Sequence, residues 1–293
     1  MIKKYPDKSS YVIDQGSNHI VFRINTYEDL HHLKQLVDAH NNRTKSRLNV
    51  IIPNLLDAQA DRRFEDNQSF GLKLVLQDLI RLNADISIFH PHNPEVVEMA
   101  FEIMGKKVKI LDNLHFMMYV LSTIAKEYSD VLDDRYFTTK RQMFLDYRLQ
   151  ENLILMSADA GGFKPLMNLA TQLNWNGVCL SSSKSRFKGE LTQLLPQQDF
   201  GGKDILIVDD ISVYGGTFKG LAKLLRKANC GKLYLAVSHI TMQNLFKDEQ
   251  DNPVTEFFDK VFTTDSKYPE YYIRDKQGQP LKPVNLEIIK AWL

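Results

Sequence analysis

The sequence predicts an α/β protein in which mostly parallel sheets are flanked by helices on both faces. Short runs of aliphatic and β-branched residues alternate with longer amphipathic stretches along nearly the whole chain. Some short runs are apolar throughout, such as residues 205–208, which is typical of strands buried on both faces of a parallel sheet. The chain has 293 residues, enough for two domains, and the charged segment 129–141 interrupts the alternation near its middle. We therefore predict one domain over residues 1–135 and a second over residues 136–293.

Local start and stop signals delimit the predicted elements of the first domain. Thr26 is a helix N-cap with Asp29 as its capping-box partner, and Asn93-Pro94 is a cap followed by proline at the first helical position. Pro53 ends a strand, and the polar stretch 54–68 is the first long loop. The predicted strands are 20–24, 48–52, 86–89 and 108–111, and the predicted helices are 26–39, 69–82, 93–104 and 116–128.

The second predicted domain repeats the same alternation. Residues 181–203 are polar and irregular, and we predict for them a long loop of the kind that often carries function. The predicted strands are 153–156, 177–180, 205–208, 232–237 and 260–263, and the predicted helices are 162–173, one that ends near 227, and 285–292.

The composition is that of an ordinary globular protein, with 43% hydrophobic and 25% charged residues. The net charge of +1 gives no overall attraction to nucleic acid or to a membrane surface. No apolar run approaches the roughly 20 residues of a membrane span, and the first residues lack the apolar core of a signal peptide. We therefore predict a cytoplasmic protein without a nucleic-acid or membrane partner. Cys179 and Cys230 lie in or beside apolar segments and are interpreted as buried small hydrophobes.

The most informative motif lies at residues 205–217. An apolar strand leads into the acidic pair Asp209-Asp210, and a short loop then leads to Gly215-Gly216-Thr217 at the start of a helix. Glycines allow backbone N–H groups to approach phosphate oxygens, and the helix N-terminus adds positive potential. The acids suit ribose hydroxyls or a metal ion. The alternative is an ordinary βα turn, but the order of strand, acids, glycines and helix favours a phosphate–sugar site.

Two further segments of the second domain carry groups suited to phosphate or metal. In residues 157–164, Asp159 is placed at a strand end, where a carboxylate can bind a hard cation, and Gly161-Gly162 follows it. The alternative is a glycine turn with a capping aspartate. In residues 181–186, Lys184 and Arg186 are spaced to face one way in an extended segment and could meet polyphosphate charge. A solvated basic loop is the alternative.

The first domain has two candidate segments of its own. Residues 52–64 contain Asp61, Arg62 and a second arginine directly after a predicted strand. His90-Pro91-His92 lies at another strand end, where two histidines could bind a metal ion. Without a third ligand, a structural histidine pair is the alternative.

Taken together, these motifs resemble the ribose-phosphate pyrophosphokinase (PRPP synthetase) family over nearly the whole chain. The segment Ser-x-Asp-Ala-Gly-Gly-x-Lys at 157–164 is similar to the family's ribose-phosphate and magnesium loop. Lys184 and Arg186 fall where the family has its catalytic Lys and Arg. The segment around Asp61-Arg62 resembles the family's ATP-contacting loop, and His92 matches the histidine of its Asp-Leu-His motif. Tyr5-Pro6-Asp7 resembles the segment that holds adenine, and Thr264-Asp265 resembles the family's Thr-Asp-Thr.

The resemblance implies two phosphoribosyltransferase-type domains, with the ATP side in the first and the ribose-phosphate side in the second. It also implies Mg²⁺ as cofactor and a homo-oligomer, either a dimer or a hexamer. The implied site residues are Lys184 and Arg186 in catalysis; Asp209, Asp210, Val213, Tyr214, Gly215, Gly216 and Thr217 at the ribose phosphate; Tyr5, Asp7, Gln59, Asp61, Arg62 and His92 at ATP; and Asp159 and His92 at the metal ion.

The chain departs from the family pattern at several of these positions. Gln59 and Ala60 replace Arg-Gln in the ATP loop, His90 replaces an aspartate, and Lys8-Ser9 replaces Gly-Glu. In this alignment the family's first strand and helix have no counterpart. At the phosphate loop, Val213-Tyr214 replaces the family's Asp-Thr before Gly-Gly-Thr.

The activity that the resemblance implies is the Mg²⁺-dependent transfer of pyrophosphate from ATP to the anomeric hydroxyl of ribose 5-phosphate, giving PRPP and AMP. The altered Val213-Tyr214 segment leaves a second acceptor open, a 5-substituted ribose phosphate such as ADP-ribose, in NAD metabolism. Two other classes also stay open: a phosphoribosyltransferase that consumes PRPP, and a catalytically silent regulatory homologue.

Overall fold

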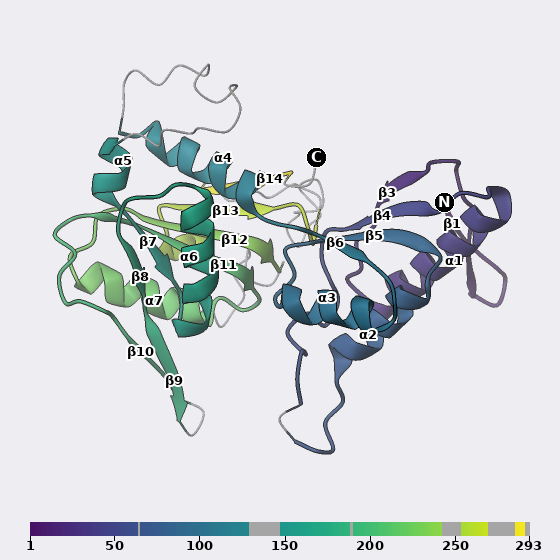
Figure 1. The fold of residues 1–293 in the computed structure, drawn as a ribbon. Coiled ribbons are helices and arrows are strands. Elements are labelled where there is room, and N and C mark those ends of the chain that lie inside the picture. The colour runs from purple at the N-terminus through teal and green to yellow at the C-terminus, as the bar shows by residue number, and fades with distance from the viewer. Residues whose placement is uncertain (64, 129–146, 188–189, 242–252, 269–284, 291–293) are drawn as a thin grey trace. The chain divides into compact units, whose positions relative to one another are not determined.

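The computed structural model describes residues 1–63, 65–128, 147–187, 190–241, 253–268 and 285–290 (Figure 1). The chain forms two compact units, the first built from Met1–Asp112 and the second from Asn113–Ala291. The predicted domain boundary near residue 135 falls within 129–146, outside the described residues.

Unit 1 contains a four-stranded parallel sheet whose strand order follows the chain, β3-β4-β5-β6 (Figure 1, purple to blue). The strands are β3 (His19–Val21), β4 (Leu48–Ile52), β5 (Ala84–Phe89) and β6 (Val108–Leu111), and the helices between them are α1 (Tyr27–Arg43), α2 (Gly71–Arg81) and α3 (Pro94–Ile103). Right-handed crossovers between successive strands put such helices on the same face of a sheet. Accordingly, alternate residues of β4 are buried in one core with residues of all three helices. These three helices and the sheet therefore share one hydrophobic core.

Two local predictions in unit 1 are confirmed. The Thr26 side chain accepts a hydrogen bond from the Asp29 N–H, and the Asp29 side chain accepts one from the Thr26 N–H, which completes the capping box. Asn93 caps α3 through its side-chain oxygen, with proline at the next position. The hairpin of β1 (Ile2–Lys4) and β2 (Ser10–Val12) was not predicted, because its short strands have no alternation of buried and exposed residues.

Unit 2 is built on a six-stranded, all-parallel sheet with the order β14-β13-β12-β11-β7-β8 (Figure 1, teal to yellow). The strands are β7 (Leu153–Ser157), β8 (Cys179–Ser181), β11 (Asp204–Ser212), β12 (Leu233–Ile240), β13 (Lys260–Thr264) and β14 (Leu286–Ile289). The helical elements are α4 (Leu114–Ala125), α5 (Tyr147–Asn152), η2 (Ala160–Gly162), α6 (Phe163–Gln172), α7 (Gly216–Lys227) and η4 (Val254–Phe257).

Successive residues of the central strands in unit 2 belong to two different cores. Ile205 and Ile207 of β11 pack in one core with the apolar face of α7. Leu206 and Val208 pack in the other core with residues of α4 and α6. Because side chains alternate along a strand, this division places helices on both faces of the sheet. The predicted fold class, α/β with parallel sheets flanked by helices, is confirmed.

Three predictions for unit 2 are wrong in detail. The stretch 181–203 is not one irregular loop, because it contains an antiparallel hairpin of β9 (Ser183–Phe187) and β10 (Glu190–Leu194) that lies outside the main sheet. The described part of the predicted helix 285–292, residues 285–290, is not helical, because its apolar run forms β14 and pairs with β13. A run this short has no periodicity that separates strand from helix. The acidic pair Asp209-Asp210 lies within β11, since that strand continues to Ser212.

Candidate functional site

The strand order of unit 2 reverses direction between β7 and β11. From β7 the chain moves to β8 on one side, and from β11 it moves to β12 on the other. In open parallel sheets, the crevice beyond the carboxyl ends of two such strands is the usual ligand site. The segments that follow these two strands contain the two glycine motifs predicted from the sequence.

The loop after β7 is organised by Asp159. Its Oδ1 atom accepts hydrogen bonds from the N–H groups of Gly161 at 2.9 Å and Gly162 at 3.2 Å. The neighbouring hydroxyl of Ser157 donates to the Asp159 carbonyl at 2.9 Å, which ties the loop to the strand end. The capping aspartate considered as an alternative is therefore present, and one carboxylate oxygen still points to another partner.

That partner is Lys184 of β9, whose ammonium forms an ion pair with Asp159 Oδ2. Burial raises the pKa of Asp159, but the hydrogen bond and charge of Lys184 and the two glycine N–H groups outweigh this and lower the pKa below its usual value. Asp159 is therefore an ionised carboxylate at neutral pH. The Lys184 side chain is 39% exposed, so an anion in solvent can reach it.

Arg186 is in the same strand as Lys184, and its backbone pairs with Leu191 of β10. Residues i and i+2 of a strand face the same way, as expected for the Lys184 and Arg186 positions. The side chain of Arg186 lies outside the described part of the structure.

The end of β11 concentrates negative charge. Burial, and after it the negative charge of Asp210, raise the pKa of Asp209 well above its usual range, and the charge of Asp159 adds to the effect. The Asp210 N–H donates to Asp209 Oδ1 at 2.9 Å. The structure therefore brings Asp159, Asp209 and Asp210 into one electrostatic environment, which favours hydroxyl donors or a cation.

The glycine loop after β11 has the geometry that an anion site requires. Gly215 has a φ of 73°, in the left-handed region, and is the N-cap of α7. A Cβ built at Gly216 would meet no atom within 4 Å, so this helix start opens to free space. Thr217 lies at the second position of the helix, where backbone N–H groups are available to an anion.

The two residues that precede this glycine loop differ in their environment. The carbonyl of Val213 accepts a hydrogen bond from the Thr241 hydroxyl, which anchors the loop to the end of β12. The side chain of Tyr214 has no such anchor in the hydrogen bonds of the described residues and is 73% exposed. An exposed aromatic ring therefore stands beside the helix start.

Sequence reasoning missed a buried polar network at the carboxyl ends of β12 and β13. His239 Nδ1 and the Ser266 hydroxyl are 2.8 Å apart, and the hydroxyls of Thr264 and Ser266 donate to the Ser238 carbonyl at 2.6 and 3.0 Å. Its signal in the sequence is the polar run that follows each apolar strand. Thr264 was identified only by its resemblance to the Thr-Asp-Thr motif. It is buried, and its hydrogen bond to Ser238 connects β13 to β12 at this edge of the sheet.

Unit 1 brings two of its predicted site residues, Arg62 and His92, close to a third, Asp61. Asn93 Nδ2 donates to Asp61 Oδ2 at 3.2 Å, and Arg62 Nε pairs with Asp61 Oδ1 at 3.1 Å. Burial raises the pKa of Asp61, but the Asn93 bond, the Arg62 bond and charge, and the charge of His92 lower it below its usual value. Both Arg62 and His92 are exposed and can meet a ligand from solvent.

Asn93 has two roles in this cluster that different substitutions separate. We expect Asn93→Ser to keep the cap of α3 and lose the bond to Asp61, since serine caps helices well but is too short to reach the carboxylate. Asn93→Ala should lose both and be less stable than Asn93→Ser by about 1 kcal/mol in urea unfolding. Carboxyl NMR titration should show a raised pKa of Asp61 in both variants. Equal stability of the two variants would contradict the capping role.

The other predicted site residues of unit 1 are Tyr5, Asp7 and Gln59. Among the described residues, none of the three is hydrogen-bonded to Asp61. Tyr5 packs against Tyr11 with ring centroids 4.5 Å apart and is 54% exposed. Asp7 accepts hydrogen bonds from the Ser9 N–H and hydroxyl within the turn between β1 and β2, and these bonds lower its pKa. Gln59 is exposed on the loop that precedes α2.

The described residues contain no group of three or more His, Cys, Asp or Glu side chains placed to hold a metal ion. The two cysteines are free, and burial raises the pKa of both thiols. Among the helices of the described ranges, none is long and apolar enough to cross a bilayer.

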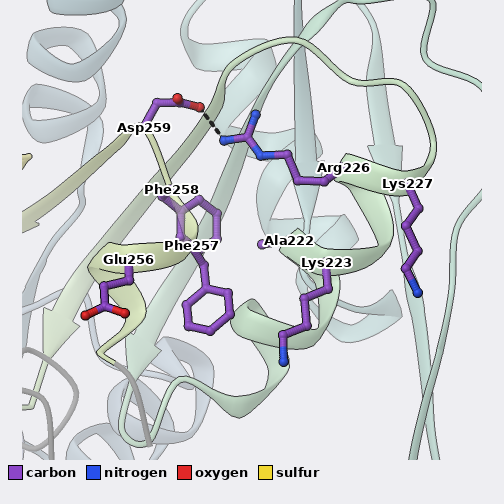
Figure 2. Close-up of a pocket in the computed structure, with 8 residues that line it drawn as sticks. All are labelled: Ala222, Lys223, Arg226, Lys227, Glu256, Phe257, Phe258 and Asp259. Atoms are coloured by element: carbon purple, nitrogen blue, oxygen red, sulfur yellow. Dashed lines mark hydrogen bonds and ion pairs between the residues drawn. The ribbon is translucent and has the colours of Figure 1, made fainter.

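A pocket of about 560 Å³ lies at the other end of α7 (Figure 2). Figure 2 shows Arg226 reaching across it to Asp259, at 2.6 Å, directly before β13 begins. The pocket is therefore at the amino-terminal edge of the sheet, away from the glycine loops. It is lined by Ala222, Lys223, Arg226, Lys227, Glu256, Phe257, Phe258 and Asp259, none of which is a predicted site residue.

Comparison with known proteins agrees with this arrangement. A family model described as a phosphoribosyl transferase domain matches residues 140–268. The chain is 26% identical over 268 residues to a ribose-phosphate pyrophosphokinase of Sulfurisphaera tokodaii, covering 87% of this chain and 81% of that protein. It is 27% identical over 246 residues to one of Pyrococcus furiosus, covering 81% and 76%. Among solved structures, the phosphoribosylpyrophosphate synthetase of Mycobacterium smegmatis has the same fold, with a TM-score of 0.71 and 17% identity over 99% of this chain and 85% of that one.

Proposed function

Because the chain belongs to the ribose-phosphate pyrophosphokinase family as a divergent member, we propose that it transfers the β,γ-pyrophosphoryl group of ATP to the anomeric hydroxyl of ribose 5-phosphate. The anomeric oxygen forms a bond to the β-phosphorus, the bond between that phosphorus and the α,β-bridging oxygen breaks, and AMP leaves. The hydroxyl proton is released, and the second product is PRPP.

The observation that carries the proposal is the presence of two glycine loops and one exposed lysine at a single edge of the sheet. Asp159 and its glycines follow β7, Gly215-Gly216-Thr217 follow β11, and Lys184 reaches the first loop from the hairpin. In this proposal, Gly215, Gly216 and Thr217 hold the 5-phosphate, and Asp209 and Asp210 accept hydrogen bonds from the ribose hydroxyls. Such a reaction needs positioning and charge stabilisation more than a nucleophilic side chain.

Lys184 and Arg186 are assigned to the negative charge of the transferring group. For Lys184 this requires that it leave Asp159, and a polyphosphate offers it a stronger and more highly charged acceptor. The exposed position of the Lys184 side chain supports this assignment, since its ammonium group is accessible to a phosphate and sits on a flexible stem.

The donor chemistry of the site fits Mg²⁺. Asp159 is an ionised oxygen ligand, and in proteins this ion typically uses one or two carboxylates while waters and substrate phosphates complete its shell. We assign Asp159, and His92 directly or through water, to its binding. When bound, Mg²⁺ would neutralise charge on the ATP polyphosphate.

The ATP side of the proposal rests on unit 1. Arg62 is held by the Asp61 carboxylate and remains 65% exposed, which suits a guanidinium that contacts phosphate oxygens. Asp61 in turn is fixed by Asn93 at the start of α3. Tyr5, Asp7 and Gln59 are assigned to the nucleotide on the family resemblance, with the Tyr5 ring as an adenine platform.

An acceptor assay tests the proposal directly. Purified protein with ATP and Mg²⁺ should release AMP only when a ribose phosphate acceptor is present, in amounts equal to the pyrophosphorylated product. Pyrophosphate release from PRPP and a nucleobase would instead indicate a PRPP-consuming transferase. Absence of turnover in both assays would indicate a regulatory homologue.

The exposed Tyr214 favours a second candidate acceptor, ADP-ribose. Its terminal ribose carries the same anomeric hydroxyl, but its 5-phosphate is part of a diphosphate linked to adenosine. The loss of the family's acid and small hydroxyl at Val213-Tyr214 relaxes the requirement for a free phosphate dianion. A ring that is 73% exposed next to open space at Gly216 could stack on the additional nucleotide.

If ADP-ribose is the acceptor, the double variant Val213→Asp, Tyr214→Thr should change the preference. We expect its kcat/KM ratio of ADP-ribose to ribose 5-phosphate to fall roughly tenfold or more, because stacking is worth about 1–3 kcal/mol per base. Tyr214→Phe keeps the ring and should keep the wild-type ratio. Strict wild-type preference for ribose 5-phosphate would refute the ADP-ribose candidate.

A further inference from the structure

We propose that Gln193 is a positioning residue that fixes the β9–β10 hairpin to the first turn of α7 and thereby sets the position of Lys184. The proposal rests on the role assigned above to Lys184. It concerns a residue on the opposite strand of the hairpin, which belongs to none of the sequence motifs.

The pairing register places the two residues side by side. Gln193 of β10 is the direct Cα partner of Lys184 of β9. Directly opposite residues of an antiparallel pair have their side chains on the same face, with Cβ atoms about 4.5–5.5 Å apart. The face of the hairpin that carries the lysine is therefore also the face that carries the glutamine amide.

The amide of Gln193 is bound to the helix that begins at the phosphate loop. Its Nε2 atom donates to the Thr217 carbonyl at 3.0 Å. Thr217 is the last residue of the Gly-Gly-Thr motif, so the hydrogen bond joins the hairpin directly to that motif.

Gly220 provides the space for this contact. A Cβ built at position 220 would overlap Gln193 Oε1, so the amide lies against a part of α7 that has no side chain. Gly220 is in the interior of the helix and is not among the residues with positive φ, so its backbone conformation does not require glycine. Glycine at such a position costs about 1 kcal/mol relative to alanine. The space that the Gln193 amide occupies therefore explains why residue 220 is glycine, although the helix backbone does not require glycine there.

The hairpin is thus held at two points, one on each side of the crevice. Lys184 binds Asp159 in the loop after β7, and Gln193 binds Thr217 at the start of α7. The first contact has to be given up when Lys184 turns to a phosphate, whereas the second does not. Gln193 therefore keeps the hairpin in place while Lys184 changes partners.

Two substitutions test this from opposite sides of the contact. Gln193→Ala and Gly220→Ala should each lower kcat by roughly 10- to 100-fold, since a displacement of about 1 Å can cost about 10²-fold. Gly220→Ala should do so while the thermal midpoint stays unchanged or rises, because alanine favours the helix. The double variant should be no slower than the slower single variant, as expected for two halves of one contact.

Thr192→Ala is the matched control, because it changes an exposed residue of β10 whose side chain lies on the other face of the hairpin. Its kcat should stay within twofold of the wild type. A Gln193→Ala enzyme with wild-type kcat, or a Gly220→Ala enzyme whose loss of kcat follows a loss of folded protein, would overturn the proposal.

Hydrogen–deuterium exchange separates this inference from the proposed function. Amides of β9 and β10 should exchange faster in Gln193→Ala and Gly220→Ala than in the wild type, whether or not the protein turns over. Unchanged exchange would refute the anchor alone. Faster exchange in a protein without pyrophosphokinase activity would uphold the anchor and refute the function assigned to Lys184.

Discussion

Replacing Lys184 with alanine is expected to lower the rate of AMP release by roughly 10²–10³-fold, the range seen when one group that stabilises transition-state charge is removed. The lysine forms its ion pair with Asp159 from a strand outside the main sheet, and its side chain contributes to none of the hydrophobic cores. The variant should therefore fold like the wild type. The measurement is AMP formation from ATP at saturating acceptor, with the thermal midpoint recorded alongside.

Lys203→Ala is the control for this variant. Lys203 is an exposed lysine directly before β11, at the amino-terminal edge of the same sheet. It should retain wild-type turnover, since it removes the same charge far from the glycine loops. AMP release at the wild-type rate in Lys184→Ala would refute the role assigned to the lysine, and loss of turnover in both variants would point to net charge instead of position.

Asp209→Asn is expected to abolish turnover and yet raise the thermal midpoint at neutral pH. Burial and the neighbouring charges of Asp210 and Asp159 raise the pKa of Asp209 well above its usual value, so its charged form opposes folding. Asparagine has a similar shape without the charge. Each 1 kcal/mol of destabilisation that the substitution removes should raise the thermal midpoint by roughly 2–4 °C, the conversion for a unit of about 150–250 residues.

The pH dependence of this gain follows from the direction of the shift. A carboxyl group whose pKa is higher in the folded than in the unfolded state binds more protons when folded, so its destabilising effect grows as the pH rises above the unfolded value. The advantage of Asp209→Asn should therefore grow as the pH rises above the unfolded pKa of about 3.9, and it should vanish below that pH, where the carboxyl is protonated in both states. Thermal unfolding of both proteins across this range measures it.

Asp199→Asn should behave in the opposite way. Hydrogen bonds from the Gly201 N–H and from Asn229 lower the pKa of Asp199, so its ionised form favours folding. Removing that charge should lower the thermal midpoint at neutral pH, and the loss should disappear at low pH. A higher thermal midpoint in both Asp209→Asn and Asp199→Asn would show that the stabilisation is not specific to the acidic pair of β11.

The sequence was sufficient for the elements in which local signals and core burial agree. The bounds of β4 and β6 are as predicted, and the caps at Thr26 and Asn93 are present. It was insufficient for the β9–β10 hairpin, whose strands are polar and are held by pairing with each other. It also failed for β14, which is a strand because β13 offers it an open edge. Backbone partners of this kind are a property of the assembled sheet and leave no periodic signal.

The candidate site shows the same division. The two glycine loops were predictable, because each follows an apolar strand and parallel strands bring their carboxyl ends to one edge. The ion pair of Lys184 with Asp159 and the bond of Gln193 to Thr217 were not, since both depend on the register of the hairpin. The sequence thus predicted which residues form the candidate site, and the structure shows the contacts that hold Lys184 and the hairpin in position.

The division of β11 between two cores also bears on how unit 2 comes apart. Its side chains contribute alternately to the two hydrophobic cores. Unfolding of one core therefore removes part of the other as well. Such an arrangement favours loss of the whole unit in one cooperative step over gradual fraying. The two glycine loops follow β7 and β11, which are interior strands of this sheet. The groups that we propose bind substrate are therefore attached to interior strands, which are the kind of element that opens least often.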